Sequence, residues 1–454
     1  MDALPPRRWL VRGAVALLVA ALLAPAVTAG VGYLTTTTDP TNLRAAVESP
    51  ANGTTYVSIQ GFHFRGYANE QKPARLVAVG PNGGVKWVHD GEGFNATWFY
   101  DVDPLANGNL LVTSTARGAT IVYELDPETR ERVWTQRLPI HDTHDVDLVN
   151  GDQLLVANMR EPDKGDRIFL YDLGNDSVVW QWQFADHFPK SGGGGGGDWT
   201  HVNDVDKIGE GRYLVSPRNF DQVIVVNRST GAITMRLGAD DDHSVLYEQH
   251  NPQYLESESG TPTMLVADSE NDRVVEYARE NGTWNRTWTL SGGLNWPRDA
   301  DRLPNGNTLV VDTMYQRVVE VTPTGEVVWE FYAPWAPYDA ERAAYGDEAG
   351  GPTMTDLGVT GTYRVHGSAG IAPTANRTVS FWVGETFAGT PLSGAANEFA
   401  RVWSHVTPWI RPVWMGSWDF LWALVGLVVL AGWSLGELVY QRARIRRAVG
   451  RYVP

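Results

Sequence analysis

A motif repeated along the middle of the chain is the feature that most limits what this sequence can fold into, because each copy of a regular repeat forms one supersecondary unit. The clearest copies, read in chain order, are DVDPLANGNLLV from Asp101, DVDLVNGDQLLV from Asp145, DVDKIGEGRYLV from Asp204 and DADRLPNGNTLV from Asp299. Weaker copies begin at Asn251 and Gly367. The repeat therefore predicts six similar structural units.

Each unit continues as a strand followed by a hairpin. Residues 120–134 (TIVYELDPETRERVW) and 318–329 (VVEVTPTGEVVW) show the pattern, in which β-branched residues alternate around turns rich in Gly, Asn or Asp. Four short strands in roughly 40–50 residues are typical of a propeller blade and not of a helical solenoid. We therefore expect an all-β fold, a six-bladed β-propeller.

The two ends of the repeat region indicate how this propeller closes. The first hairpin, Arg75–Trp87, has no preceding inner strand of the repeated type, and the last copy, around Gly367–Gly384, has no clear hairpin after it. Pairing these two segments in one blade would leave no open sheet edge. The sequence thus predicts circular closure between Arg75–Trp87 and the strands that follow His366.

The residue just before each copy is a candidate for a functional site, because equivalent positions in a closed array meet around one axis. Three of the ten histidines in the chain fall at this position. The six residues are Tyr100, His144, Asn203, His250, Arg298 and His366. His201 lies two residues before Asn203 and so shares a strand face with it, and Arg218 ends the next strand.

The residue types in this predicted ring favour binding of a small oxyanion. Arginine holds tetrahedral oxyanions through paired hydrogen bonds. A neutral imidazole can attack a phosphoryl or sulfuryl centre covalently. Three imidazoles on one axis are also a plausible set of metal ligands, here His144, His250 and His366.

Composition excludes several other classes of function. The net charge is −16 and the arginines at both ends of the chain leave a still more acidic middle, which disfavours nucleic acid as a partner. Many Asp and few Lys residues fit a high-salt environment, and we interpret the acid in that way, with no metal site assigned. The absence of cysteine excludes disulfides and thiolate chemistry. No nucleotide-binding loop or HExxH motif is present, and no cofactor is expected.

Apolar segments flank the repeats. Ala14–Leu34 follows three arginines and fits a signal peptide or an anchor, and Ser417–Tyr440 precedes five more arginines. The positive-inside rule places both basic flanks in the cytoplasm and the propeller outside, where seven glycosylation sequons agree with it. The predicted parts are a signal or anchor (1–34), a propeller ectodomain (35–412), a transmembrane helix (413–440) and a basic cytoplasmic tail (441–454).

Three segments of the chain resemble the arylsulfate sulfotransferases, a family of six-bladed propellers. They are HVNDVDKIGEGRYLVSPRN from His201, EQHNPQ around His250 and the later SENDRVVEY. The resemblance extends over roughly Leu76–Gly384 and is strongest from His201 to His250. Members of this family move a sulfuryl group from a phenolic sulfate ester to another phenol, without a nucleotide sulfate donor, through a transiently sulfated histidine.

The resemblance implies roles for individual residues. It makes His250 the nucleophile and matches His201 and Asn203 to the family's His-x-Asn pair. Arg218 corresponds to a sulfate-binding arginine, and His144 to a histidine that contacts the phenol oxygen. His366 and Arg298 correspond to no family motif and are expected to bind substrate only because of their repeat position.

The expected function is therefore an extracytoplasmic, membrane-anchored sulfotransferase. Its expected partners are an aryl sulfate donor and a phenol or glycan acceptor, with no nucleic acid and with the oligomeric state left open. Two alternatives remain: a non-catalytic cell-surface propeller that binds a partner, and a metal-dependent propeller lyase or hydrolase that uses the three histidines as ligands.

Overall fold

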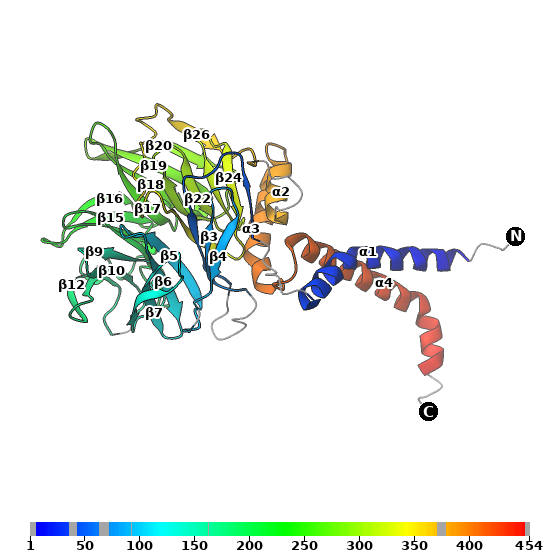
Figure 1. Ribbon diagram of the computed structural model, residues 1–454. Coiled ribbons are helices and arrows are strands. Elements are labelled where there is room, and N and C mark those ends of the chain that lie inside the picture. The colour runs from blue at the N-terminus through cyan, green and yellow to red at the C-terminus, as the bar shows by residue number, and fades with distance from the viewer. Residues whose placement is uncertain are drawn as a thin grey trace. The chain divides into compact units, whose positions relative to one another are not determined.

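Six mainly antiparallel sheets form the body of the protein in a computed structural model, which describes residues 6–35, 43–62, 72–91, 93–161, 163–369 and 378–449 (Figure 1). Four sheets have four strands and two have a fifth strand at an edge. The sequence alternates β-branched and polar residues around tight turns, and this pattern forms antiparallel hairpins. The arrangement is a six-bladed β-propeller with two long apolar helices toward the ends of the chain.

The first three blades are continuous in the sequence. Blade one contains β5 (Trp98–Pro104), β6 (Leu110–Ala116), β7 (Ala119–Leu125) and β8 (Arg132–Leu138). Blade two contains β9 (Val146–Val149), β10 (Gln153–Asn158), β11 (Arg167–Asp172) and β12 (Ser177–Gln183). Blade three contains β13 (Val202–Gly209), β14 (Arg212–Pro217), β15 (Gln222–Asn227) and β16 (Ile233–Gly238).

Blades four and five each gain an outer strand from another part of the chain. Blade four contains β17 (His250–Glu256), β18 (Pro262–Asp268), β19 (Arg273–Glu280), β20 (Thr283–Ser291) and the parallel edge strand β26 (Gly361–Arg364). Blade five contains β21 (Pro297–Arg302), β22 (Thr308–Asp312), β23 (Arg317–Val321), β24 (Val327–Tyr332) and the edge strand β1 (Arg44–Val47).

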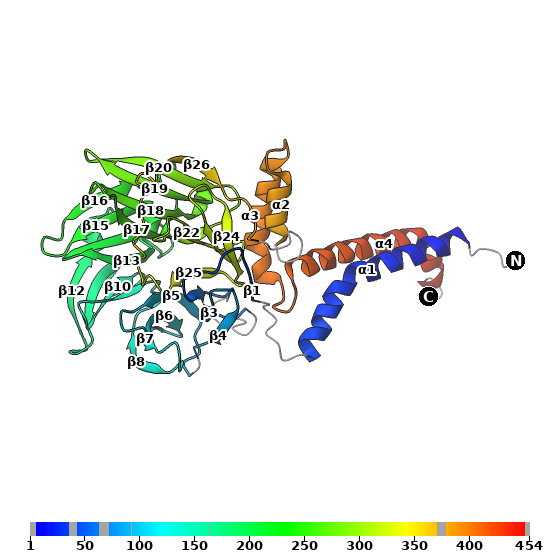
Figure 2. The ribbon, with the colours of Figure 1, turned by 45° about the horizontal axis from the view of Figure 1, so that its top comes forward.

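Blade six joins distant parts of the chain, but with a different partner from the one predicted. Its inner strand is β25 (Pro337–Arg342), which pairs with β2 (Thr55–Ile59), followed by β3 (Arg75–Val79) and β4 (Val85–His89). β25 also lies beside β5 of blade one (Figure 2). The inner strand that carries the sixth copy of the repeat therefore lies at Tyr338–Glu341. The prediction that placed this copy at Gly367–Gly384 is wrong. Part of that predicted segment, residues 370–377, lies outside the described residues.

The core of the propeller lies between neighbouring blades. Trp329 on the fourth strand of blade five is fully buried against Val57 and Val77 of blade six, and Trp288 of blade four packs in a cluster with Val310 and Val319 of blade five. The tryptophans that end the hairpins thus fill the space between sheets. Burying each such side chain stabilises the contact between blades by roughly 1.5–3 kcal/mol.

Helices make the chain a mixed structure, so the expectation of an all-β fold is wrong. The segment predicted to form the last strand is instead helix α2 (Val379–Phe387), which Thr378 caps by accepting a hydrogen bond from the Phe381 N–H. Helix α3 (Ser393–Ile410) follows it. Two short 3₁₀ helices, η2 (Arg218–Phe220) and η3 (Ser269–Asn271), connect strands within blades three and four, and a third, η1 (Phe184–Asp186), lies between blades two and three.

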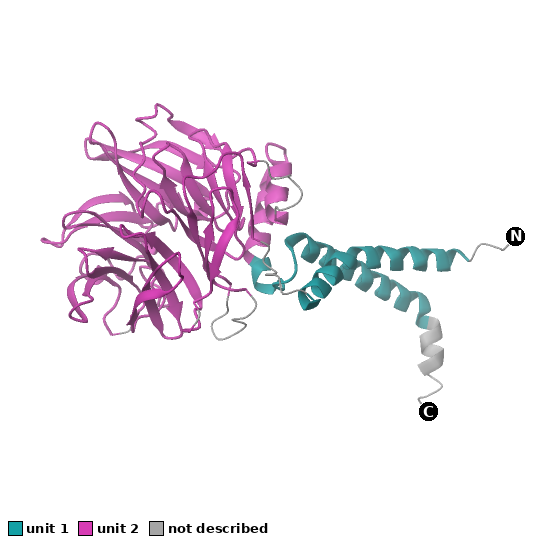
Figure 3. Cartoon of the chain, in the orientation of Figure 1, with its two compact units in different colours: residues 1–42, 406–454 teal, residues 43–405 magenta. Residues whose placement is uncertain are grey.

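The chain divides into two compact units, residues 43–405 and residues 1–42 with 406–454 (Figure 3). Unit 1 of Figure 3, which is residues 1–42 with 406–454, contains α1 (Arg7–Thr35) and α4 (Ser417–Val449), which contact each other and are joined by an ion pair between Arg12 and Glu437. Arg7–Thr35 and Ser417–Arg442 are both long and apolar enough to cross a membrane.

Candidate active site

In four of the six blades, a β-bulge at the start of the inner strand presents the ring residue. In blades one, five and six the pairing with the second strand skips one residue, which is Tyr100, Arg298 or Tyr338. In blade three it skips Asn203 together with Asp204. A bulge bends the strand and changes the direction of its side chains. The ring residue and the acid that follows it therefore need not point to opposite faces of the sheet.

The structure brings five of the six predicted ring residues together and replaces the sixth. The ring of His144 lies 5.0 Å from that of His201 and 5.4 Å from that of Tyr338, measured between centroids. Tyr338 in turn lies 6.0 Å from His250 and packs under the Arg298 guanidinium at 4.7 Å. Tyr338 therefore occupies the blade-six position of the ring, which had been assigned to His366.

His366 lies elsewhere. It is exposed, forms a bridge with Glu326 beside the outermost strands, and donates its backbone N–H to Gly325. Its predicted place in the ring is wrong, and the repeat position therefore gives no support for a contact between His366 and substrate. The three-histidine metal set of His144, His250 and His366 fails for the same reason.

His250 is held with one ring nitrogen bound and the other unpartnered. The Ser269 hydroxyl donates to the Pro297 carbonyl oxygen at 2.7 Å, so its oxygen is left to accept from the His250 Nδ1–H, at 2.8 Å. Nε2 is buried and has no hydrogen-bond partner. This arrangement selects the tautomer whose Nε2 carries a free lone pair.

Two further ring residues present unpartnered polar atoms around His250. Asn203 donates Nδ2 to the Gln249 carbonyl oxygen at 2.9 Å, and its Oδ1 has no partner. Arg298 donates Nη1 to Gln60 at 2.5 Å and stacks on Trp296 at 4.2 Å, whereas its Nε is unpartnered. A donor and an acceptor are therefore both unused in this buried region.

His144 belongs to a network that includes two tyrosines. The Tyr338 hydroxyl lies 3.0 Å from His144 Nδ1, and the Tyr100 hydroxyl donates to Asp142 at 2.7 Å. Burial, reinforced by the Asp142 charge on Tyr100, raises the pKa of both tyrosines well above the usual value. Both phenols therefore remain protonated and able to donate hydrogen bonds.

His201 is fixed by a carboxylate on the glycine-rich loop. Its Nδ1 lies 2.8 Å from Asp198, which also pairs with Arg160, and Arg160 reaches on to Asp142. The loop that precedes Asp198 packs too closely for side chains, because a Cβ on Gly194 would lie 2.1 Å from the Asn219 amide nitrogen. The first glycines of the run thus pack against Asn219 and its neighbours, whereas Gly195–Gly197 have open space around them.

Arg218 lies where the sequence predicts, at the end of the second strand of blade three, but it is already paired. Its Nη2 lies 3.0 Å from Glu248, and its Nε donates to Asn219 at 3.1 Å. Glu248 is only two residues before His250 in the sequence. An anion that binds Arg218 must therefore compete with this carboxylate.

The three buried histidines are neutral at physiological pH. Burial lowers the pKa of His250 well below 6.5, and the nearby Arg298 and Arg218 charges lower it further. Burial and Arg218 lower the pKa of His201 to about 3. The pKa of His144 is also lowered, again mainly by burial. An uncharged imidazole is the form that acts as a nucleophile.

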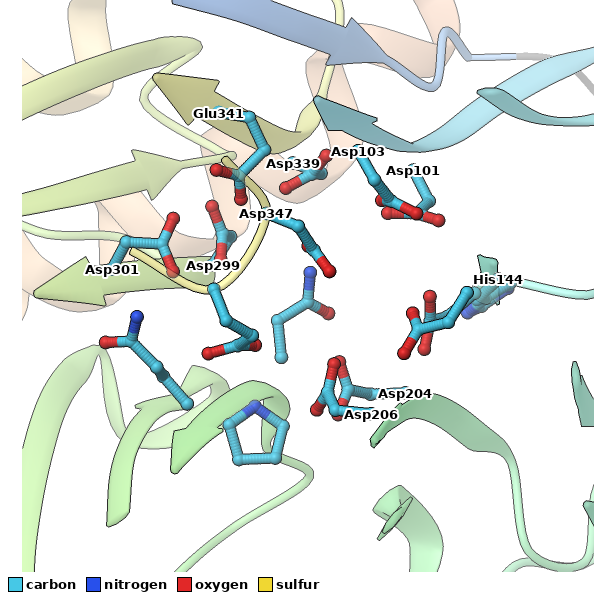
Figure 4. Close-up of a pocket in the computed structure, with 16 residues that line it drawn as sticks. Asp101, Asp103, His144, Asp204, Asp206, Asp299, Asp301, Asp339, Glu341 and Asp347 are labelled. Carbon is cyan, nitrogen blue, oxygen red and sulfur yellow. The ribbon is translucent and has the colours of Figure 1, made fainter. Parts of the chain in front are cut away.

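A cavity of about 30 Å³ lined by acidic residues adjoins the ring at His144 (Figure 4). Its carboxyl groups come from the repeated Asp-x-Asp motif and one loop: Asp101, Asp103, Asp145, Asp147, Asp204, Asp206, Asp299, Asp301, Asp339, Glu341, Asp347 and Glu348. Burial and mutual repulsion raise the pKa values of these acids, to about 7 for Asp347. We call this feature the acidic channel.

Most first acids of the motif also join neighbouring blades. Asp339 accepts from the Val102 N–H at 3.0 Å, Asp101 from Val146 at 3.5 Å, and Asp299 from Ala340 at 3.2 Å. Each bond runs from one inner strand to the backbone of the next. The repeated Asp therefore has a structural role that sequence reasoning missed.

The propeller and its ring belong to a recognisable class. The family model for arylsulfotransferase (ASST) matches residues 54–284, just over half of the chain. The protein therefore belongs to the arylsulfotransferase family. No curated protein matches the chain.

Solved structures with a similar arrangement are distant. A protein of unknown function from Bacteroides caccae is 13% identical over 70% of this chain and 98% of its own, with a TM-score of 0.43. A putative 6-phosphogluconolactonase from Bacteroides fragilis is 12% identical over 67% and 99%, with a TM-score of 0.41. An inactive variant of virginiamycin B lyase from Staphylococcus aureus is 7% identical over 64% and 89%, with a TM-score of 0.39.

Proposed function

We propose that the protein transfers a sulfuryl group from an aryl sulfate ester to an acceptor hydroxyl, with His250 as the covalent carrier. The observation that carries this proposal is the state of His250, whose Nδ1 is bound to Ser269 and whose Nε2 is buried and unpartnered. Membership of the arylsulfotransferase family agrees with this chemistry.

In the first half-reaction Nε2 attacks the sulfur atom and the ester S–O bond breaks. A phenolate leaves, and the sulfuryl group is then bonded to the imidazole. Arg298 and Arg218 support the negative charge on the non-bridging oxygens, much as cationic groups do in phosphoryl transfer. Tyr338 and His144, which share a hydrogen bond, would donate hydrogen bonds to the departing phenolate, and the phenolate then takes its proton from solvent.

In the second half-reaction an acceptor hydroxyl attacks the sulfohistidine. The acceptor hydroxyl loses its proton to the neutral imidazole of His144, which releases it to solvent, and the sulfuryl group passes to the acceptor oxygen as the N–S bond breaks. His250 returns to its starting tautomer. Because Nε2 is fully buried, both substrates require side chains over the ring to move before they reach it.

We further propose that the protein is membrane-anchored, with the propeller outside the cell and the basic tail inside. The support is the pair of long apolar helices, each next to several arginines. The same proposal divides the chain into a signal or anchor (1–34), an ectodomain (35–412), a spanning helix (413–440) and a tail (441–454). An ester donor suits this location, since nucleotide sulfate donors belong to the cytoplasm.

Steady-state kinetics test the proposed activity. With a chromogenic aryl sulfate as donor and a second phenol as acceptor, the full-length protein in detergent should release the donor phenol and form the acceptor ester. Double-reciprocal plots at several acceptor concentrations should be parallel, as ping-pong transfer requires. Folded protein without turnover would favour the non-catalytic binding module instead.

A further inference from the structure

The acidic channel contains far more negative groups than its structural role needs. Twelve carboxyl groups line the cavity, and no lysine or arginine is among the lining residues. The hydrogen bonds between blades account for one oxygen on some of these acids only. The remaining oxygens face one another across a small space (Figure 4).

Asp204 shows why one carboxyl oxygen is left without a partner. In blades one and two, Asp101 and Asp145 each accept the backbone N–H of a valine in the next inner strand. The residue equivalent to these valines beyond Asp204 is Pro252, which has no N–H to donate. Asp204 Oδ2 therefore has no hydrogen-bond partner, although the residue is only 6% exposed.

Asp206 repeats this situation on the same strand. It is 7% exposed, it lines the cavity, and its Oδ2 also has no hydrogen-bond partner. Burying a carboxylate that has no hydrogen-bond donor costs free energy unless a positive charge lies beside it. Carboxyl oxygens of Asp145, Asp204 and Asp206 all lie within 4.8 Å of one another, which is close enough for one ion to contact all three.

We propose that Asp145, Asp204 and Asp206 bind a divalent cation of the calcium type in the acidic channel. Calcium takes carboxylate and carbonyl oxygens at about 2.3–2.6 Å in flexible geometry, which suits oxygens of this spacing. The cavity of about 30 Å³ exceeds the roughly 10–15 Å³ that one water-sized species needs.

Nearby groups complete the proposed site. Asn251 lines the same cavity and has an unpartnered side-chain oxygen, so it offers a neutral ligand. Asp347 is half-buried and Glu348 is exposed, and both line the cavity, which gives an ion a path from solvent. The cation holds blades two and three together from inside the channel, next to the ring that carries His144.

Calcium binding by the full-length protein in detergent tests this site. After chelation and dialysis, wild-type protein should bind about one Ca²⁺ per chain by elemental analysis. Its thermal unfolding midpoint should rise by several degrees when Ca²⁺ is added back, because an ion that binds only the folded state stabilises it. Asp204→Asn with Asp206→Asn should weaken Ca²⁺ binding at least about 100-fold and abolish the shift.

The chain offers a matched control. Asp221, Asp241 and His243 form another group with metal-like spacing on the propeller, but Asp241 and His243 are exposed. Asp241→Asn should leave Ca²⁺ binding and the thermal shift unchanged.

If the double variant does not fold, Asp204→Asn alone should still weaken Ca²⁺ binding measured by titration calorimetry. Wild-type protein that binds no Ca²⁺, or a folded double variant that binds it like the wild type, would overturn the proposal. Because metal content and unfolding are measured without substrate, failure here leaves the sulfotransferase proposal unaffected.

Discussion

Single residues of the ring owe their chemistry to neighbours that lie far away in the sequence. The neutral state of His250 depends on burial and on two arginines from other blades, and its tautomer depends on the Ser269 hydroxyl. The repeat position alone indicated His144, Asn203, His250 and Arg298 in advance. It could not indicate that Glu248 pairs with Arg218 or that Asp198 pairs with His201, because those contacts depend on loop conformation.

Removing the Ser269 hydroxyl should impair catalysis through His250. Ser269→Ala leaves Nδ1 without its acceptor, so the tautomer with a free Nε2 is no longer selected, and kcat should fall at least about tenfold. Thr313 is the equivalent residue of blade five and donates to the Pro337 carbonyl at 2.9 Å, without a histidine partner. Thr313→Ala therefore loses the same kind of bond between blades and should keep its kcat. Equal losses in both variants, measured as aryl sulfate turnover, would show that Ser269 has only a structural role.

Glu248 forms an ion pair with Arg218, so we expect it to weaken the binding of a sulfate ester to that guanidinium. Glu248→Gln removes a negative charge 3.0 Å from the guanidinium, so KM for the aryl sulfate should fall about fivefold with little change in kcat. Arg218→Gln should instead lower kcat/KM by about 10²–10³, as expected when an oxyanion partner is lost. A higher KM in Glu248→Gln would mean that the ion pair positions Arg218 for the substrate.

At the level of whole elements, the repeat predicted six blades and most of their strands, but it misplaced the last one. β25 contains Tyr-Asp-Ala-Glu, which matches Tyr-Asp-Val-Asp at Tyr100–Asp103. No hairpin follows it, because its partner strands β2–β4 come from residues 55–89, at the start of the propeller. Local periodicity cannot reveal such a partner. It also gave no reason to expect a helix at Val379–Phe387, because a short apolar run such as this fits either structure.

The carboxyl oxygen of Asp339 should stabilise the contact between blades six and one. Asp339→Ala leaves the buried Val102 N–H without an acceptor, which should cost about 1–3 kcal/mol and lower the unfolding midpoint by several degrees. Asp339→Asn keeps an acceptor oxygen and should lose less than about 1 kcal/mol. Calorimetry of both variants checks this. Similar midpoints for the two would contradict a specific role for this hydrogen bond.

At the scale of the whole molecule, the chain has two units of different composition, a polar propeller and a pair of apolar helices. The arginines beside each helix predict the side on which the propeller lies. The chain has no cysteine, so one introduced cysteine is a unique reporter of that side. On intact cells, a membrane-impermeant maleimide should label Glu128→Cys in an exposed turn of blade one. It should label Gln441→Cys only after permeabilisation, and the reverse pattern would invert the topology.

The central claim is that His250 carries the sulfuryl group, and intact mass of the protein tests it most directly. The full-length protein is incubated with an aryl sulfate without acceptor, and the reaction is quenched in alkali to protect an N-linked adduct. The intact mass of the protein is then measured. The wild type should gain about 80 Da, the mass of one SO₃, and the gain should disappear when a phenol acceptor is added. His250→Ala should gain nothing and transfer nothing, whereas His201→Ala should still form the adduct slowly. An adduct that persists in folded His250→Ala, or transfer by that variant at the wild-type rate, would contradict the account.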